Sequence, residues 1–589
     1  MSGLPRGSGV SLTAKWLVAL LLLAVSAKDL FVPVRDPDFF WHLKTGEWIW
    51  EQRSLPDEFL FTASEQRSPA VVQRFAMTSY WAAEVLYHLA YAVGGMGGIV
   101  VLRILLFSLL LLLLLRSRKE ADDLVLLGLL VLAAIVLSAY PEERPQYFSF
   151  VFAAVLLWLL ERLRAPGSAA SLRWGAAGVP VLMVVWANCH GGFVVGLGLM
   201  GIYVLAESIK RLHPALAPLP AERWRLLLAA GGGGFVASLL NPNSWHVFEV
   251  AILPAWATEF VTEYRSTIAA FRYGAEDAII VYWMLLAIVV ATLLLTWKKP
   301  DLTTIALTAV TGYFSFTQLR YIPFFLVAAL PAAARALSTP RLVRPARVAI
   351  AAAGLAAGLF YLRDAGEMPG NLSRIAEVDR SRFPVDAADF IQREGLQGNL
   401  FNQYEWGGYL LWRLAPAKSF IDGRLTDKGL LDTYNRILVG DFRPVDGRPF
   451  WKDHFAKHGI HYTVTTPFNL YNGKVTGLID VLLTDPGWAP VFVSPPSVVF
   501  AEDTPANHQA IRRNALQQGR FYKLLLDSCD PWIAAQPGNP APYVARGDLL
   551  LRLGERPAAL RAYEEALRFA PRHPIAKAKA DWLRATGVR

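Results

Sequence analysis

Long apolar segments alternate with short polar ones over the first 362 residues of the chain. A helix needs about 20 mainly apolar residues to cross roughly 30 Å of hydrocarbon. Apolar segments of about this length lie near residues 12–32, 98–115, 122–140, 145–160, 175–190, 193–209, 224–240, 278–296, 302–317, 320–336 and 347–362. The pattern predicts a polytopic α-helical membrane protein with about eleven transmembrane helices.

The first two of these segments are separated by a long polar stretch, residues 33–97. Within it, Tyr80 to Val93 is apolar, but it contains Glu84 and His88 and is too short to span the bilayer. We expect this stretch to form an external loop with interfacial helices. At the N-terminus, an apolar run follows Lys15 and resembles a secretory signal, but because further spans follow it we interpret it as an uncleaved first helix.

Basic residues fall mainly in every second loop between the predicted spans. With the N-terminus inside, the inner loops hold Arg116, Arg118, Lys119, Arg162, Arg164, Arg173, Lys210, Arg211, Arg223, Arg225, Lys298, Lys299, Arg335, Arg341, Arg344 and Arg347. The alternate short loops hold Arg144, Arg265, Arg272 and Arg320. Positive charges favour the cytoplasmic side. The pattern therefore predicts a multi-pass protein of the inner (plasma) membrane, with a cytoplasmic N-terminus and an extracytoplasmic C-terminal region.

The composition changes after residue 362. Residues 363–505 combine β-rich runs, such as His461–Thr465 and Ser497–Phe500, with helical ones such as Ala387–Glu394, and predict a small extracytoplasmic α/β domain. Residues 506–589 are helical in pattern, and YVARGDLLLRLGERPAALRAYEEALRFAPRHP matches one tetratricopeptide repeat (TPR). We therefore expect three parts: a transmembrane domain over 1–362, the α/β domain over 363–505, and a short TPR-like array over 506–589. This array either binds a protein partner or packs on the preceding domain.

Composition narrows the function classes. The chain is 54% hydrophobic, and its net charge of +10 comes mostly from segments between apolar runs. The soluble part has no basic stripe with interleaved aromatic residues, so the sequence argues against nucleic-acid binding. The two cysteines, Cys189 and Cys529, provide neither a disulfide framework nor a metal cluster.

The first external loop opens with RDPDFFWHLKTGEWIW, which holds two carboxylates two residues apart. On an extended segment Asp36 and Asp38 point the same way and could bind a divalent cation or share a proton. On a helix they diverge, with Asp36 as the N-cap, Pro37 at the first helical position and Asp38 in the first turn. Both interpretations stay open, because a capping aspartate can also face a cavity.

Further polar residues occur in other loops predicted to lie on the same side. Each alone is explained by a solvated loop, but ionisable groups at the rim of an apolar bundle cost free energy unless they face a polar cavity. We therefore predict one shared external site, with substrate-binding candidates Glu142, Arg144, His190, Asn241, His246 and Arg320.

Several motifs together resemble a known superfamily. DPDFFWHLKTGEWI is followed by WAAEVLYHLAYAVGG, and NQYEWGGYLLWRLAP by FIDGRLTD. With an N-inside first span and an external C-terminal domain, they resemble the GT-C superfamily of polyprenyl-phosphate-sugar-dependent glycosyltransferases. More narrowly, they resemble a group of bacterial membrane proteins related to the dolichyl-phosphate-mannose protein mannosyltransferases. The likeness covers most of residues 12–505.

The resemblance implies a function and roles for particular residues. It implies transfer of a sugar from a polyprenyl-phosphate donor to an extracytoplasmic acceptor in one displacement. Asp36 would be the general base or help to organise a divalent ion such as Mg²⁺ or Mn²⁺, with Asp38 as the alternative and His42 as a further catalytic candidate. An external arginine, Arg144 or Arg320, would hold the lipid phosphate. WAAEVLYH stands where the mannosyltransferases have a basic HPPLAK-like segment, so the likeness does not extend to their protein acceptor.

Two other functions fit parts of the pattern. One is a non-catalytic membrane scaffold of cell-envelope glycan assembly, which recruits partners through the TPR-like tail. The other is a transporter, which would place charges near the middle of the bilayer in broken spans. Here the charges gather at one face instead, which favours the glycosyltransferase.

Overall fold

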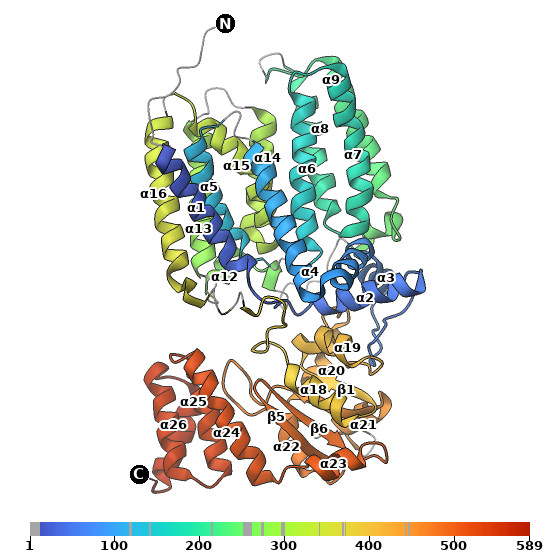
Figure 1. Cartoon of the computed structure of the whole chain (residues 1–589), viewed down its shortest axis with the longest axis vertical. Coiled ribbons are helices and arrows are strands. Elements are labelled where there is room, and N and C mark those ends of the chain that lie inside the picture. Colours follow the sequence, from blue (N-terminus) through green and yellow to red (C-terminus); the bar gives the residue numbers. More distant parts are fainter. Residues whose placement is uncertain are drawn as a thin grey trace. The chain divides into compact units, whose positions relative to one another are not determined.

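The computed structural model describes residues 12–116, 121–140, 143–213, 216–250, 262–272, 276–295, 301–340, 342–367, 370, 373–441, 443–445 and 448–588 (Figure 1). The chain divides into two compact units. The first unit comprises Met1–Asp36, Thr45–Pro56 and Arg74–Glu377, and the second comprises Pro37–Lys44, Asp57–Gln73 and Val378–Arg589. The first external loop is therefore shared between the units. The predicted boundaries at 362 and 505 stay predictions.

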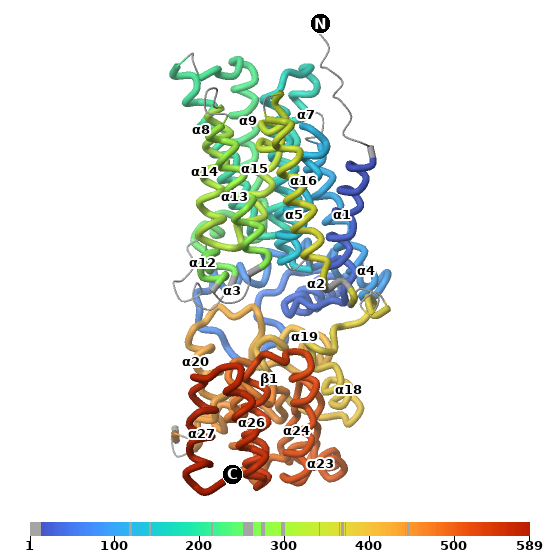
Figure 2. Tube along the Cα trace, turned by 90° about the vertical axis from the view of Figure 1, so that its left-hand side faces the viewer, coloured from blue at the N-terminus to red at the C-terminus, as the bar shows by residue number. Residues whose placement is uncertain are grey.

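The first unit is a bundle of long apolar helices that run side by side (Figures 1 and 2). They are α1 (Leu12–Leu30), α4 (Trp81–Leu115), α5 (Asp123–Leu137), α6 (Gln146–Arg164), α7 (Ala169–Cys189), α8 (Phe193–Lys210), α9 (Ala221–Ser238), α13 (Glu276–Leu295), α14 (Leu302–Thr317), α15 (Ile322–Leu337) and α16 (Val343–Tyr361). A helix thus lies at every predicted span. Among the described residues, seven helical segments are long and apolar enough to cross a membrane, and α5 and α14 are apolar but shorter. The chain is a multi-pass membrane protein, and the exact count of eleven stays a prediction.

Shorter elements join these helices. They are α2 (Phe39–Gln52), α3 (Ala70–Thr78), η3 (Ser244–His246), α10 (Val247–Val250), η4 (Thr262–Tyr264), α12 (Thr267–Arg272), η5 (Leu319–Tyr321) and η6 (Leu362–Glu367). Helix α4 is interrupted at Gly94 and Gly95, and Gly95 has a φ of 56°. That left-handed backbone is accessible to glycine at little cost. The interruption separates the predicted interfacial stretch, Tyr80 to Val93, from the second predicted span.

Ion pairs join loops that were predicted to lie on the same side of the membrane. Lys15 pairs with Asp123 at 2.7 Å, and Arg164 pairs with Asp301 at 2.7 Å. These contacts connect the start of α1 to that of α5, and the end of α6 to the start of α14. They agree with the predicted alternation of loops. Which end of the bundle faces the cytoplasm remains a prediction.

The second unit contains a four-stranded mixed sheet in the order β1-β4-β6-β5. β1 (Asn399–Asn402) pairs in parallel with β4 (Ile460–Thr465), whereas β6 (Ser497–Glu502) is antiparallel to both β4 and β5 (Trp488–Ser494). The helices of this part are α18 (Val385–Glu394), α19 (Gly407–Leu414), α20 (Lys428–Leu438), α21 (Phe450–Lys457) and α22 (Gly477–Thr484), and a small ribbon pairs β2 (Pro444–Val445) with β3 (Arg448–Pro449). The mixed sheet and its helices agree with the predicted α/β domain.

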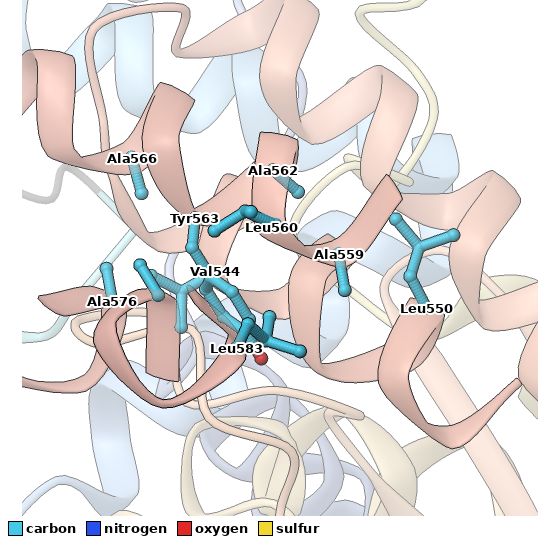
Figure 3. Close-up of a cluster of buried hydrophobic side chains, with 10 residues drawn as sticks. Val544, Leu550, Ala559, Leu560, Ala562, Tyr563, Ala566, Ala576 and Leu583 are labelled. Carbon is cyan, nitrogen blue, oxygen red and sulfur yellow. The ribbon is translucent and has the colours of Figure 1, made fainter. Parts of the chain in front are cut away.

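The rest of the second unit is helical, with α23 (His508–Asn514), α24 (Gln518–Ala535), α25 (Ala541–Arg552), α26 (Arg556–Phe569) and α27 (Pro574–Ala585). Tyr563 lies at the centre of their buried cluster (Figure 3). A side chain at Gly547 would lie 2.6 Å from the Tyr563 ring, and Gly554 turns the chain between α25 and α26 with a φ of 83°. These are the small-residue and turn positions that the repeat pattern predicts. The TPR assignment itself stays a prediction.

Candidate functional site

Two of the predicted site residues form an ion pair at one end of the bundle. Asp36 follows α1, and only 2% of its surface is exposed. Arg144, just before α6, donates from Nε to Asp36 Oδ2 at 2.8 Å. Its Nη1 also donates to Glu263 Oε1 in η4 at 2.6 Å. A buried carboxylate needs such compensation, because an unpaired charge there would be strongly destabilising. Arg144 thus connects two acids from separate loops.

A second arginine fixes the backbone on both sides of this pair. Arg103, inside α4 and 2% exposed, donates to the carbonyl oxygens of Leu30 and Val32, each at 2.6 Å. It also pairs with the buried Glu143 at 2.5 Å. Because Glu143 precedes Arg144 and Val32 lies near Asp36 in the chain, Arg103 holds both supporting segments. Sequence reasoning missed this residue, although a lone arginine inside an apolar span is a recognisable signal.

Arg320 lies in η5 against aromatic side chains. Its Cζ is 4.7 Å from the centre of the Tyr264 ring, a cation–π geometry. It also interacts electrostatically with Glu263 and with Tyr80. Glu263 therefore lies in the field of both predicted phosphate-binding arginines, Arg144 and Arg320. We did not single out Glu263 or Tyr264 from the sequence, because an acid in an external loop has no distinguishing local pattern.

His190 is buried one residue beyond the end of α7. Its Nδ1 accepts the backbone N–H of Gly192 at 2.9 Å and lies 2.7 Å from Ser149 Oγ. Burial, with the charge of Arg320 as the second cause, lowers the pKa of His190 to about 3. The ring is therefore neutral at physiological pH, with its proton on Nε2. His190 thus lies within electrostatic range of Arg320. The shared external site stays a prediction.

The other predicted substrate-binding residues have local contacts. Asn241 donates from Nδ2 to the carbonyl of Ser238 at 2.7 Å and accepts the N–H of Asn243, which makes a turn after α9. His246 is exposed, and its Nδ1 lies 3.0 Å from Glu249 Oε1. Neither contact connects to the arginines. Glu142 lies outside the described residues.

Asp38 and His42 belong to the second unit, whereas Asp36 belongs to the first. Helix α2 begins at Phe39, so Asp38 rather than Asp36 occupies the position before its first turn. The Nε1 of Trp41 donates to Asp38 Oδ1 at 3.3 Å. His42 is 4% exposed, with its ring 3.4 Å from that of Trp41, centre to centre. The three catalytic candidates of the first loop, which are neighbours in the sequence, thus fall in two different compact units.

The glycines of the soluble-domain motifs lie against the segment that carries Asp38. A side chain at Gly408 would lie 2.7 Å from the carbonyl oxygen of Pro37, and one at Gly423 would lie 1.8 Å from Asp38 Oδ1. These distances leave no space for a Cβ. The backbone of the chain's own first loop therefore packs directly against these glycines.

The FIDGRLTD motif holds the same loop through a buried ion pair. Arg424 pairs with Asp422 at 2.8 Å, and Thr62 donates to Asp422 Oδ2 at 3.0 Å. Burial by itself raises the pKa of Asp422, but Arg424 and the hydrogen bonds outweigh it and lower that pKa. Ser64 Oγ also donates to the carbonyl of Phe420 at 2.5 Å. These motifs bind the first-loop segments within the second unit.

The predicted divalent metal site does not fit the groups around Asp36. Among the residues that the structure describes, no three His, Cys, Asp or Glu side chains gather as metal ligands. The Asp36 carboxylate instead receives the positive charge of Arg144 at 2.8 Å. Hard divalent ions need several oxygen ligands around them. We therefore assign roles to these side chains without a metal ion, and the Mg²⁺ or Mn²⁺ prediction stays a prediction.

Comparisons with known proteins identify solved structures with a similar fold. No family model matches the chain, and no curated protein matches its sequence. The arabinofuranosyltransferase AftD from mycobacteria matches with a TM-score of 0.53 and 15% identity, over 85% of this chain and 40% of that one. The archaeal oligosaccharyltransferase AglB from Archaeoglobus fulgidus, in complex with an inhibitory peptide and a dolichol-phosphate, matches with a TM-score of 0.53 and 10% identity, over 98% of this chain and 86% of that one.

The chain shares the fold of these two structures, an arabinofuranosyltransferase and an oligosaccharyltransferase. This chain spans less than half the length of AftD. Fold alone does not determine a reaction, because unrelated activities occur on the same fold. What this chain does must therefore be argued from its own side chains.

Proposed function

We propose that the protein is a membrane glycosyltransferase that moves a sugar from a polyprenyl-phosphate donor to an extracytoplasmic acceptor. The observation that carries the proposal is the ion pair between the buried Asp36 and the partly exposed Arg144, with Arg320 close to the shared acid Glu263. One carboxylate and two arginines at one end of an apolar bundle are suited to a lipid-linked anionic donor. The dolichol-phosphate in the AglB structure supports this donor class.

The proposed reaction is a single displacement. Asp36 takes the proton from an acceptor hydroxyl, and the acceptor oxygen forms a bond to the anomeric carbon. The bond between that carbon and the phosphate oxygen breaks, and polyprenyl phosphate leaves with the electron pair. Arg144 and Arg320 offset the negative charge that develops on this leaving group. Asp38 stays the alternative base and His42 a further candidate.

Arg144 already binds two carboxylates in the structure. Its Nε donates to Asp36 and its Nη1 donates to Glu263. A phosphate that binds Arg144 competes with both carboxylates and would release Asp36 to act as a base. Arg320, which packs against the Tyr264 ring, is suited to make the first phosphate contact because a guanidinium binds phosphate oxygens with two donors.

Asp36→Asn tests the proposal directly. We expect transfer of labelled sugar from a polyprenyl-phosphate donor in isolated membranes to fall about a hundredfold or more, because a general base contributes about that much. Asp123→Asn is the matched control, since Asp123 pairs with Lys15 in a loop predicted to lie on the other side. Asp38→Asn tests the alternative base. Unchanged transfer with folded Asp36→Asn protein would disprove the catalytic assignment.

The proposal also requires a particular orientation of the protein in the membrane. The acceptor would be extracytoplasmic only if the Asp36 end of the bundle faces outward, with the N-terminus in the cytoplasm of an inner-membrane protein. Cysteines introduced near residues 118 and 298 should then be protected from an impermeant label in intact cells. Cys189 and Cys529 are buried and give a low background. Labelling at the introduced positions would reverse the orientation.

The C-terminal helices support a second role, protein recruitment. Phe569 is 46% and Trp582 is 49% exposed, and exposed aromatic residues commonly anchor protein interfaces. We expect deletion of residues 506–589 to abolish capture of a partner from the cell envelope while sugar transfer persists. If transfer is absent from the full-length protein but capture occurs, the scaffold function would replace the enzyme.

A further inference from the structure

A large cavity opens at the end of the bundle that the sequence places in the cytoplasm. Its volume is about 860 Å³, within the range of ligand-binding pockets. Apolar side chains from four helices form most of its wall, including Leu113, Leu157, Leu307 and Val327. The cavity lies between α4, α6, α14 and α15. Its walls are therefore suited to hydrocarbon.

Three arginines, Arg116, Arg162 and Arg335, also line this cavity. The guanidinium carbons of Arg116 and Arg162 lie 4.7 Å and 5.3 Å from the centre of the same Trp158 ring. Within the described part of the chain, neither of these two arginines forms an ion pair with an acid. Arg162 Nε donates to Ser171 Oγ at 3.0 Å, which leaves its terminal amino groups to face an anion.

The acid of the cavity does not cancel this charge. Glu161 lines the same space, but its Oε1 pairs with Arg164 Nη1 at 2.7 Å and accepts the Tyr203 hydroxyl at 2.7 Å. Arg164, which is not part of the wall, pairs with Glu161 as well as with Glu207 and Asp301, so the wall itself holds one acid against three arginines. The cavity therefore combines an apolar interior with a net positive rim.

This site is separate from the Asp36 site. Helix α6 has 19 residues, with Arg144 just before its first residue and Arg162 near its last. At 1.5 Å per residue the helix is about 28 Å long, close to the hydrocarbon thickness of a bilayer. One phosphate cannot contact arginines at both ends. The two sites would face opposite leaflets.

We propose that this cavity binds an anionic phospholipid of the inner leaflet, with its phosphate on Arg116, Arg162 and Arg335 and its acyl chains between the helices. Basic pockets between transmembrane helices on the cytoplasmic side are suited to such headgroups. The charge of the rim selects against zwitterionic lipids, and the apolar wall selects against free phosphate. This inference does not depend on the proposed glycosyltransferase activity.

The test uses the full-length protein in nanodiscs of phosphatidylcholine, alone or mixed with phosphatidylglycerol, and counts retained lipids by native mass spectrometry. We expect retention of phosphatidylglycerol over phosphatidylcholine by about tenfold, and a loss of about tenfold in Arg116→Gln or Arg335→Gln. Arg211→Gln is the matched control, because Arg211 stacks on Trp224 at 4.7 Å but does not line the cavity.

Two further variants keep the test decisive if a glutamine variant fails to fold. Arg335→Lys retains the charge and should keep most of the phosphatidylglycerol, whereas Ala332→Trp fills the space and should release it with the arginines intact. Equal retention of both phospholipids by the wild type, or unchanged retention in Ala332→Trp, would overturn the proposal. Displacement of phosphatidylglycerol by an equal amount of polyprenyl phosphate would assign the cavity to the donor lipid instead.

Discussion

The two ends of the helix bundle both contain buried ionic groups but arrange them differently. At the Glu207 end, which comprises Glu207, Arg164, Lys210 and Asp301, the acids and bases pair with one another. Glu207, 0% exposed, accepts from Arg164 at 2.7 Å and from Lys210 at 2.8 Å, and Asp301 pairs with both of these cations. The network connects the ends of α6 and α8 to the start of α14.

At the Asp36 end, which comprises Asp36, Arg144, Glu263 and Arg320, the pairing is incomplete. Arg144 serves two acids, while Arg320 packs on the Tyr264 ring and forms no ion pair with a described acid. The difference indicates a division of labour. At the Glu207 end both cations have ion-pair partners, and Arg164 also pairs with Glu161, so this network stabilises the helix ends. At the Asp36 end Arg320 rests on an aromatic ring, and its guanidinium is available to an incoming anion.

Removal of one arginine from each end should affect sugar transfer differently, and this is the largest expected effect. We expect Arg144→Gln to lower sugar transfer per folded molecule about a hundredfold or more, because a donor to the leaving phosphate is lost, and also to lower stability, because the buried Asp36 loses its cation partner. We expect Arg164→Gln to cost about 3–5 kcal/mol of stability, since it leaves buried acids uncompensated. Thermal unfolding in detergent and transfer per folded molecule measure the two effects. If both variants lose only stability, the ends do not differ in function.

Arg103→Gln should lower transfer about tenfold, because Arg103 holds the backbone ahead of both Asp36 and Arg144 and small displacements of reacting groups are costly. The expected signature is a lower kcat with little change in KM for the donor. Arg173→Gln, at an exposed position on α7, is the control. A normal kcat in folded Arg103→Gln protein would show that the Arg103 contacts are not needed to position Asp36 and Arg144.

Glu263→Gln tests whether Glu263 competes with the donor phosphate for Arg144. Without this carboxylate, Arg144 loses one competitor for the donor phosphate and Arg320 loses an opposing charge. We therefore expect KM for the donor to fall about threefold. Glu249→Gln serves as control, because Glu249 pairs with the exposed His246. A higher KM would mean that Glu263 orders the arginines rather than competing with the phosphate.

The last prediction concerns stability in acid, where the effect grows as the pH falls. His190 has a pKa lowered to about 3 in the folded protein, against an ordinary value of 6.5. The unfolded chain therefore binds this proton first, so stability falls as the pH drops from about 6.5 towards 3. We expect His190→Gln to flatten that part of the profile of thermal unfolding against pH, with no change above pH 7. An unchanged slope would mean that other groups carry the acid sensitivity.

Much of the fold could be predicted from the sequence, because apolar length is a local property. A helix lies at every predicted span, and β4 and β6 lie where the β-rich runs were found. The Asp36 and Arg144 candidates came from reasoning about charge at a membrane rim, and they form a direct ion pair. Asn241 and His246 were predicted on the same grounds but make local contacts in the described part of the chain. Loops at one end of the bundle cover a larger area than a single site, so a position at that end does not by itself place a residue in the site.

The sequence by itself determined the membrane character and the alternation of basic loops, since these follow from hydrophobicity and charge counted along the chain. Only the tertiary structure decided which charges meet. Asp36 and Arg144 are 108 residues apart, and Arg103 reaches a backbone carbonyl 73 residues away. It also assigned Asp36 and Asp38 to different compact units and packed Gly408 and Gly423 against the first loop. Such pairings depend on how helices pack, and no local pattern encodes that packing.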